Sequence, residues 1–259
     1  SGKDNKKVST ISVGELETQM IEAYKEGMRE LEKGDVIYAS RKFNEAELLY
    51  PQSEWASKSI LMSAYAFYSQ NYYERSILEL ERFISKYPKH KNIDYAYFLL
   101  AMNHYENIID EKKDLEPLLL SKEKFEYIIK NYPTTDFAQD AEYKLGLIQD
   151  VLASKEMHIA KYYLKRKKWV AAINRFKTIL SDYETTVYVE EALHRLVETY
   201  YKIGLVNEAE KYASVLGYNY QSSKWYEATY IIFNKEYKTS LTAKKDKKSV
   251  LKKFKNIFK

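Results

Sequence analysis

Small and apolar residues recur along this chain at fixed intervals that predict pairs of packed helices. In the first unit a small residue, Gly27, is followed at offsets of 12, 16, 19 and 24 by Ala39, Phe43, Ala46 and Pro51. Steps of three and four residues keep side chains on one helix face, where they can pack against a partner helix. The same offsets recur, less completely toward the C-terminus, in units that start at Ala64, Ala160 and Val197.

A tyrosine–proline pair ends each of the first three units. Because proline cannot continue a helix and disfavours helix in the residue before it, each pair marks the end of a helical unit. Three of the chain's 4 prolines lie in this mark. The pairs are Tyr50-Pro51, Tyr87-Pro88 and Tyr132-Pro133, and a degenerate fourth copy is Tyr183-Glu184.

These units predict an all-α fold, a tetratricopeptide (TPR) solenoid of about five helix-turn-helix repeats. A solenoid stacks its repeats into an extended surface, and its usual function is to bind another protein. Residues 1–17 are expected to form a flexible tether, residues 18–235 the solenoid and residues 236–259 a basic amphipathic tail. The repeats are expected at about 20–52, 56–89, 94–134, 137–184 and 188–221, followed by a terminal helix.

The third and fourth units depart from the regular spacing. From Ala101, the matching second helix starts eight residues late, at Ser121. The inserted residues fall in the charged stretch 110–114 and predict an extended loop. An additional helix at roughly 137–154 is expected before the fourth pair, and helical patterning continues to Lys165.

Composition excludes several other architectures. The chain has only 7 glycines and 4 prolines, far too few for the turns of a β-sandwich or barrel. Its 26 tyrosines suit half-buried helix faces, where the ring packs inward and the hydroxyl stays hydrated. With 0 cysteines, the sequence has no disulfide, thiolate metal site or cysteine nucleophile. No apolar run approaches the ~18 residues that a membrane-spanning helix needs.

The net charge of +5 comes from the C-terminal tail. Residues 244–259 carry eight Lys and one Asp, a charge of +7, so the rest of the chain carries −2. Its apolar residues form a helical stripe against the lysines, which favours attachment to anionic lipid or an acidic partner. The alternatives are a frayed basic end and, with weaker support, RNA contact. Because the rest of the chain is nearly neutral rather than basic, we expect no nucleic-acid partner. The stripe consists of Val250, Leu251, Phe254, Ile257 and Phe258.

The sequence offers no constellation for catalysis. Its glycines are scattered singly, which argues against a phosphate-binding loop, and no serine lies in a Gly-x-Ser-x-Gly turn. None of the histidines is paired at a metal-ligand spacing. We therefore expect no enzyme activity, no cofactor and no metal site. The histidines are His90, His104, His158 and His194.

Two stretches carry a more specific signal than the repeat positions. The first is Glu81-Arg82-Phe83-Ile84 with Pro88-x-His90-x-Asn92-Ile93-Asp94-Tyr95, and the second runs from Ala160-x-Tyr162-Tyr163 through Arg166 and Trp169-Val170-Ala171 to Asn174-Arg175. They resemble the BamD (ComL) family, the TPR lipoproteins of the outer-membrane β-barrel assembly machinery (BAM). The resemblance covers about residues 20–216. It implies a non-catalytic scaffold subunit of five TPRs, lipid-anchored at the periplasmic face of the outer membrane.

The resemblance also implies partners. These are the POTRA domains of BamA, unfolded outer-membrane proteins and other BAM lipoproteins, so that the chain assists assembly and insertion of β-barrel proteins. The insertion is shorter than in the enterobacterial members, the basic tail has no counterpart there, and the lipidated cysteine is absent. Ser1 either follows such a cysteine in the precursor or was introduced by cloning. The alternative is a generic TPR peptide-binding adaptor or co-chaperone.

The resemblance assigns candidate partner-binding residues to the fourth repeat. Arg175 matches the family arginine that contacts the last POTRA domain of BamA, and Arg166 and Trp169 are its expected companions. A guanidinium suits this role because its planar fork matches a carboxylate. The alternatives are a solvated helix arginine and a tryptophan that packs at the turn.

Seven residues of the N-terminal repeats are candidates for a groove that receives the C-terminal segment of an unfolded substrate. For the asparagine and aspartate at the start of the third repeat we favour helix capping, in which their oxygens accept first-turn amides, over a place at the groove edge. For each tyrosine the alternative is core packing. The candidates are Tyr65, Tyr68, Asn71, Asn92, Asp94, Tyr95 and Tyr97.

Overall fold

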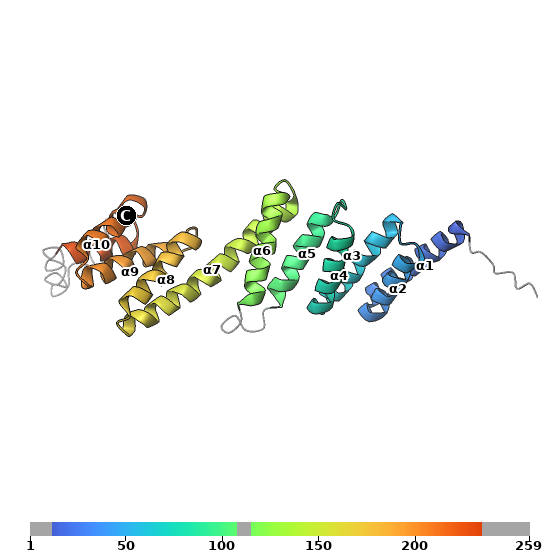
Figure 1. The fold of residues 1–259 in the computed structure, drawn as a ribbon, viewed down its shortest axis with the longest axis horizontal. Coiled ribbons are helices and arrows are strands. Elements are labelled where there is room, and N and C mark those ends of the chain that lie inside the picture. The colour runs from blue at the N-terminus through green and yellow to red at the C-terminus, as the bar shows by residue number, and fades with distance from the viewer. Residues whose placement is uncertain (1–11, 108–114, 235–259) are drawn as a thin grey trace, which may run out of the picture. The chain divides into compact units, whose positions relative to one another are not determined.

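The computed structural model describes residues 12–107 and 115–234, and this part of the chain is helical with no strand (Figure 1). Its helices form five consecutive pairs and a terminal helix, the architecture of a TPR solenoid. They are α1 (Val13–Lys33), α2 (Val36–Leu49), α3 (Glu54–Ser69), α4 (Tyr73–Lys86), α5 (Ile93–Glu106), α6 (Glu116–Asn131), α7 (Asp136–Lys165), α8 (Trp169–Asp182), α9 (Val189–Lys202), α10 (Val206–Asn219) and α11 (Lys224–Phe233).

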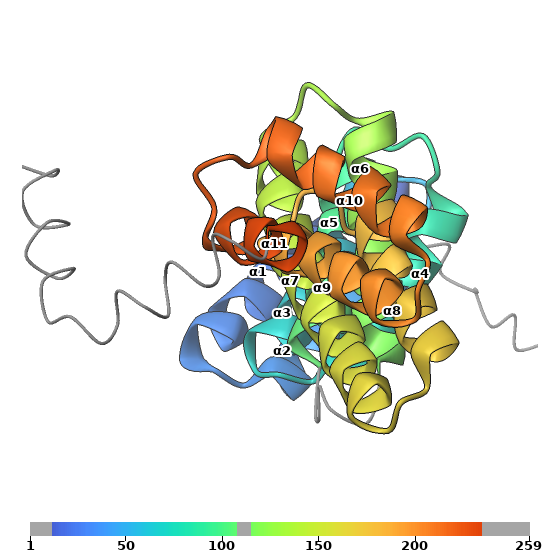
Figure 2. The ribbon, with the colours of Figure 1, turned by 90° about the vertical axis from the view of Figure 1, so that its left-hand side faces the viewer.

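The chain divides into two compact parts, Ser1–Leu145 and Gly146–Lys259, called the N-terminal and C-terminal parts below. In the N-terminal part each helix from α1 to α5 packs on the next one, so that α6 is the last of the series. In the C-terminal part α8, α9 and α10 pack in the same order, and α11 lies against α9 and α10 (Figure 2). Thr229 of α11 is tied to His194 of α9 by a 2.8 Å hydrogen bond between Oγ1 and Nδ1.

The core follows the predicted offsets. The residue at offset 16 is a fully buried phenylalanine in three repeats, Phe43, Phe125 and Phe176, and a fully buried leucine, Leu80, in the second. Large side chains at this position fill the space between the two helices of a pair. In the fifth repeat Ala213 takes this position and is only partly buried.

Small residues allow the two helices of each pair to approach closely. A Cβ added to Gly27 would lie 2.8 Å from the Phe43 ring. The Ser76 hydroxyl donates to the Ala64 carbonyl of its partner helix at 2.8 Å. In the third repeat the Ser121 hydroxyl makes the equivalent bond, at 3.0 Å, to the Ala101 carbonyl. The eight-residue displacement of this packing position is therefore confirmed, but α6 begins at Glu116 and not at Ser121 as expected.

A tyrosine ends the second helix of every pair. A serine or threonine three residues later reaches back to the tyrosine carbonyl or caps the next helix; Ser53, for example, donates to the Tyr50 carbonyl at 2.8 Å and accepts from the Ala56 amide at 3.2 Å. The second pair is the exception, because His90 stands at this position. The five tyrosines are Tyr50, Tyr87, Tyr132, Tyr183 and Tyr220, of which the last was not predicted.

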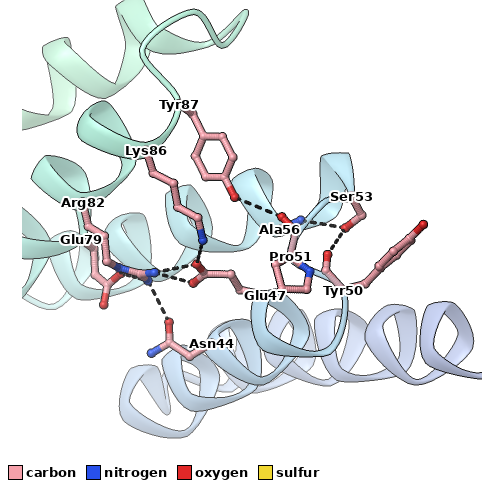
Figure 3. Close-up of polar contacts among 10 residues, drawn as sticks. All are labelled: Asn44, Glu47, Tyr50, Pro51, Ser53, Ala56, Glu79, Arg82, Lys86 and Tyr87. Atoms are coloured by element: carbon pink, nitrogen blue, oxygen red, sulfur yellow. Dashed lines mark hydrogen bonds and ion pairs between the residues drawn. The ribbon is translucent and has the colours of Figure 1, made fainter. Parts of the chain in front are cut away.

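A buried carboxylate ties the first repeat to the second (Figure 3). Glu47 of α2 is 6% exposed, and its oxygens lie 2.6 Å from Arg82 Nη1 and 2.7 Å from Lys86 Nζ of α4. The Tyr87 hydroxyl donates to the Pro51 carbonyl at 3.5 Å. These contacts fix α4 against α2 and thereby the start of the third repeat.

Two expectations about helix boundaries differ from the structure. Helix α1 begins at Val13, so residues 13–17 are helical rather than part of a tether; Ser12 and Glu15 cap each other's amides in a capping box. The separate helix expected at 137–154 is wrong, because α7 runs unbroken from Asp136 to Lys165. The predicted loop at 110–114 and the tail at 236–259 lie outside the described residues.

Candidate functional site

The N-terminal part has a polar pocket of about 340 Å³ between the start of α3 and the start of α5. His90 is fixed at its edge. The Asn92 amide donates to His90 Nδ1 at 3.1 Å, so the ring proton lies on Nε2 and is donated to the Ser57 hydroxyl at 3.1 Å. Burial and then the charge of Lys91 lower the pKa of His90, which is therefore neutral at pH 7. The pocket is lined by Glu54, Trp55, Lys58, His90, Lys91 and Asn92.

One cation of this pocket is held over aromatic rings. Lys58 Nζ lies 4.8 Å from the Trp55 ring centroid and 5.3 Å from that of Tyr24. Such contacts hold the ammonium group in place while it stays exposed to solvent. Tyr65 lies two turns further along α3 on the same face, and its side chain is 41% exposed. This face of α3 therefore carries an exposed positive charge and an exposed hydroxyl.

The structure separates the predicted groove residues. Tyr65, Tyr68 and Tyr95 form one group, in which burial and then the neighbouring phenols raise the pKa of Tyr95 to about 12. Tyr97 instead packs on Tyr127 with ring centroids 4.4 Å apart. Asn71 lies in the α3–α4 turn with a φ of 63° and accepts a 2.9 Å bond from the Tyr73 hydroxyl.

Capping is only partly as predicted at the start of α5. Asn92 occupies the cap position, but its side chain makes no capping hydrogen bond, so that prediction is wrong. Its own amide is instead satisfied by His90. Asp94 does accept a first-turn amide, from Tyr95 at 2.8 Å. The Asn92 side chain is exposed and free to face the pocket.

In the C-terminal part, Arg175 of α8 reaches back to α7. Its Nη1 lies 3.0 and 3.1 Å from the two carboxylate oxygens of Glu156. The arginine side chain is 42% exposed. Lys42 holds the same repeat position in α2, at offset 15, and pairs with Glu26 of α1 at 3.2 Å. Sequence reasoning missed Glu156, although an acid on the first helix opposite offset 15 is a signal that these two repeats share.

Arg166 and Trp169 have different neighbours from Arg175. Arg166, in the α7–α8 turn, stacks its guanidinium over the Tyr162 ring at 4.7 Å. Trp169, the first residue of α8, faces α9, where Lys202 Nζ lies 5.2 Å from its ring centroid. The structure therefore brings Arg166 and Trp169 to one turn and places Arg175 against α7. A second pocket of about 340 Å³ at this turn is lined by Leu164, Trp169, Glu198, Thr199, Tyr201, Lys202 and Ile232.

Neither a metal site nor a membrane span is found among residues 12–107 and 115–234. No group of three or more His, Cys, Asp or Glu side chains is arranged there to hold a metal ion. The helices described there are all too short or too polar to cross a membrane. Paired helices stacked in this order define the class of protein, a TPR protein.

Comparison with known proteins identifies the family. The outer membrane lipoprotein family matches residues 16–216, and the chain belongs to this family, BamD. Outer membrane protein assembly factor BamD of Rickettsia prowazekii is 42% identical over 207 residues, 80% of this chain and 82% of that protein. BamD of Caulobacter vibrioides is 39% identical over 211 residues, 82% of this chain and 69% of that protein.

Solved structures include more distant likenesses. The crystal structure of MamA aligns with a TM-score of 0.37 and 20% identity, covering 82% of this chain and 96% of that one. A thermophilic TPR protein of Thermus thermophilus aligns with a TM-score of 0.38 and 13% identity, covering 83% of this chain and 98% of that one.

Proposed function

We propose that this chain is a non-catalytic scaffold subunit of the BAM complex at the periplasmic face of the outer membrane, held there by a lipid anchor. In this role the C-terminal part docks the POTRA domains of BamA and the N-terminal part receives unfolded outer-membrane protein. The names of the relatives support a role in outer-membrane protein assembly. In this proposal the chain contributes binding and positioning.

The geometry of Arg175 carries the BamA assignment. Both of its bonds to Glu156 come from Nη1, so the Nε and Nη2 edge of the guanidinium remains available. A carboxylate of a POTRA domain can bind this edge with two parallel hydrogen bonds. Glu156 fixes the guanidinium beforehand, which reduces the ordering that binding requires. We assign docking to Arg175, because Trp169 faces α9 and the guanidinium of Arg166 is stacked on the Tyr162 ring.

The test is binding of the full chain to the purified POTRA domains of the cognate BamA by calorimetry. Arg175→Glu should weaken binding about 100-fold, because it removes a charge-assisted pair and adds repulsion. Lys42→Glu is the matched control, since Lys42 holds the same repeat position in the N-terminal part. Circular dichroism checks that both variants fold. Equal binding by the unaltered chain and the Arg175→Glu variant would remove Arg175 from the interface.

The substrate part of the proposal rests on the exposed groups along α3 and the pocket beside His90. An extended chain has unpaired backbone amides and carbonyls, which the Tyr65 hydroxyl, Lys58 and Asn92 can satisfy. Tyr65→Ala should weaken binding of an unfolded outer-membrane protein segment about fivefold by fluorescence anisotropy. Tyr72→Ala is the control, because Tyr72 is 46% exposed but lies in the α3–α4 turn.

The two measurements also separate this proposal from a generic peptide-binding adaptor. An adaptor would bind the peptide segment and show no affinity for POTRA domains. A BAM scaffold binds both, and each variant impairs one partner. Failure of a well-folded chain to bind cognate POTRA domains would therefore favour the adaptor.

A further inference from the structure

The turn between α7 and α8 presents four consecutive cations. Lys165 ends α7, Lys168 precedes α8, and Arg166 and Lys167 lie between them. All four are exposed. The turn itself is tightly bonded, because the amides of Arg166 and Lys168 donate to the Tyr163 carbonyl at 3.2 and 3.0 Å. The charges are therefore held together by a fixed turn.

These charges are not neutralised by the part of the chain that the structure describes. Lys165, Lys167 and Lys168 form no ion pair with any described residue, whereas Lys161, one turn earlier, pairs with Glu191 at 2.6 Å. One cation at the end of α7 is explained by the helix dipole, but four are not. The equivalent stretch of the first repeat, Glu32-Lys33-Gly34-Asp35, has one cation, Lys33, which pairs with Glu30 at 2.7 Å.

Two exposed aliphatic residues belong to this end of α8 and to the α9–α10 turn. Val170 is 71% exposed and Leu205, in the α9–α10 turn, is 50% exposed. Lys202 at the end of α9 links the two turns through its contact with the Trp169 ring. Lone aliphatic side chains, a half-buried tryptophan and unpaired lysines thus share one edge of the C-terminal part. We call Lys165, Arg166, Lys167, Lys168, Trp169, Val170, Lys202 and Leu205 the basic edge.

We propose that the basic edge binds the surface of a bilayer that contains anionic phospholipids. Lysines near such a surface are attracted to its phosphates, tryptophan rings favour the interface, and short aliphatic side chains can enter the headgroup region. The observations favour lipid over an acidic protein. Val170 and Leu205 lie outside the pocket that Trp169 and Lys202 line, and such exposed short aliphatic side chains beside cations suit insertion between lipid headgroups.

This inference is independent of the docking assigned to Arg175. The relatives belong to an outer membrane lipoprotein family, so a bilayer is expected close to the basic edge. A lipid contact at the C-terminal part would orient the chain on that bilayer. Failure of POTRA binding would leave the lipid proposal standing, and failure of lipid binding would leave the docking proposal standing.

The test is flotation of the full chain with vesicles of phosphatidylethanolamine and phosphatidylglycerol at about 150 mM salt, compared with phosphatidylcholine vesicles. The triple variant Lys165→Gln, Lys167→Gln, Lys168→Gln should lower the partition coefficient about tenfold on the anionic vesicles. The control is a second triple variant that removes the same charge elsewhere and keeps the same tail. It carries Lys25→Gln, Lys33→Gln and Lys211→Gln, and should lose less than about twofold.

A single substitution tests the apolar component. Val170→Ser should lower partitioning about threefold, and Val187→Ser, at a residue 77% exposed in the α8–α9 loop, should leave it unchanged. Equal losses in the two triple variants would overturn the proposal, because net charge alone would then explain binding. Loss of POTRA binding without loss of vesicle binding in the turn variant would also overturn it, and would assign the edge to protein docking.

Discussion

The two parts of the chain share one repeat but differ in where their charges are satisfied. Phe43 and Phe176 fill the same core position in the N-terminal and C-terminal parts. In the N-terminal part, however, Glu47 is buried between two cations of the next repeat, whereas in the C-terminal part Arg175 is half exposed. The comparison teaches that the core positions are interchangeable between repeats. What distinguishes the parts is charge outside the core, and that is where we assign function.

The largest expected effect concerns Glu47. Glu47→Ala leaves Arg82 and Lys86 without their shared carboxylate and should lower the free energy of unfolding by about 2–3 kcal/mol, less than a fully buried pair because both cations are partly exposed. Glu156→Ala should cost only about 0.5–1 kcal/mol, since Arg175 can hydrate. Urea unfolding of both variants measures the difference.

Equal losses in these two variants would contradict the comparison. They would mean that the Arg175–Glu156 pair is as structural as the Glu47 cluster, and the case for Arg175 as a docking residue would weaken. Lys33→Ala is a useful baseline, because its pair with Glu30 is exposed and should contribute very little.

Substitutions of two glycines, one in each part, are expected to change stability by smaller amounts and in opposite directions. Gly27→Ala places a Cβ 2.8 Å from the Phe43 ring and should destabilise the chain by about 2 kcal/mol. Gly146, in α7, has nothing within 4 Å of an added Cβ. Gly146→Ala should therefore stabilise the chain by about 0.5–1 kcal/mol through helix propensity. Thermal unfolding followed by circular dichroism should show Tm shifts of opposite sign; a loss of stability in the Gly146 variant would contradict the open surroundings.

A dependence of stability on pH is expected in the C-terminal part. A hydrogen bond from His194, and then one from Arg195, lower the pKa of Glu198 from 4.5 to about 2. Because the folded-state pKa is the lower one, the contribution to stability is present above pH 4.5 and lost as the pH falls from 4.5 toward 2. With its partial exposure discounted, this contribution is about 1 kcal/mol.

Glu198→Gln is the variant for this measurement. It should lower Tm at about pH 7 and have a much smaller effect at about pH 2.5. At the lower pH the Glu198 carboxyl of the unfolded chain is protonated, so the unaltered protein has already lost most of the stability that this carboxylate contributes. Glu208→Gln, in an exposed pair with Lys211, should change Tm little at either pH. An equal effect of Glu198→Gln at both pH values would show that its role is packing.

The fold could be predicted where packing imposes a period on the sequence. Helix pairs must bury one face, so the offsets recur, and even the displaced Ser121 can be located from its neighbours. Two missed features had local signals. Ser12 and Glu15 have the spacing of a capping box. No proline or turn pair interrupts α7, and its single glycine, Gly146, is not enough to break a helix.

The site was less predictable, because its contacts join residues that no period relates. Arg175 and Glu156 are 19 residues apart on different helices. Trp169 and Lys202 meet only because α8 packs on α9. His90 stands out as part of a motif, but its bond to Ser57 depends on how α3 approaches the loop before α5. Such contacts follow from the three-dimensional packing of repeats.

The central claim is that the C-terminal part binds POTRA domains and the N-terminal part binds substrate. Photo-crosslinking tests it most directly. A photoreactive residue is placed at Asn174, which is exposed beside Arg175, or at Tyr65, and each full chain is mixed with POTRA domains and an unfolded outer-membrane protein. The account predicts POTRA adducts from position 174 and substrate adducts from position 65. Substrate adducts from position 174, or POTRA adducts from position 65, would contradict it.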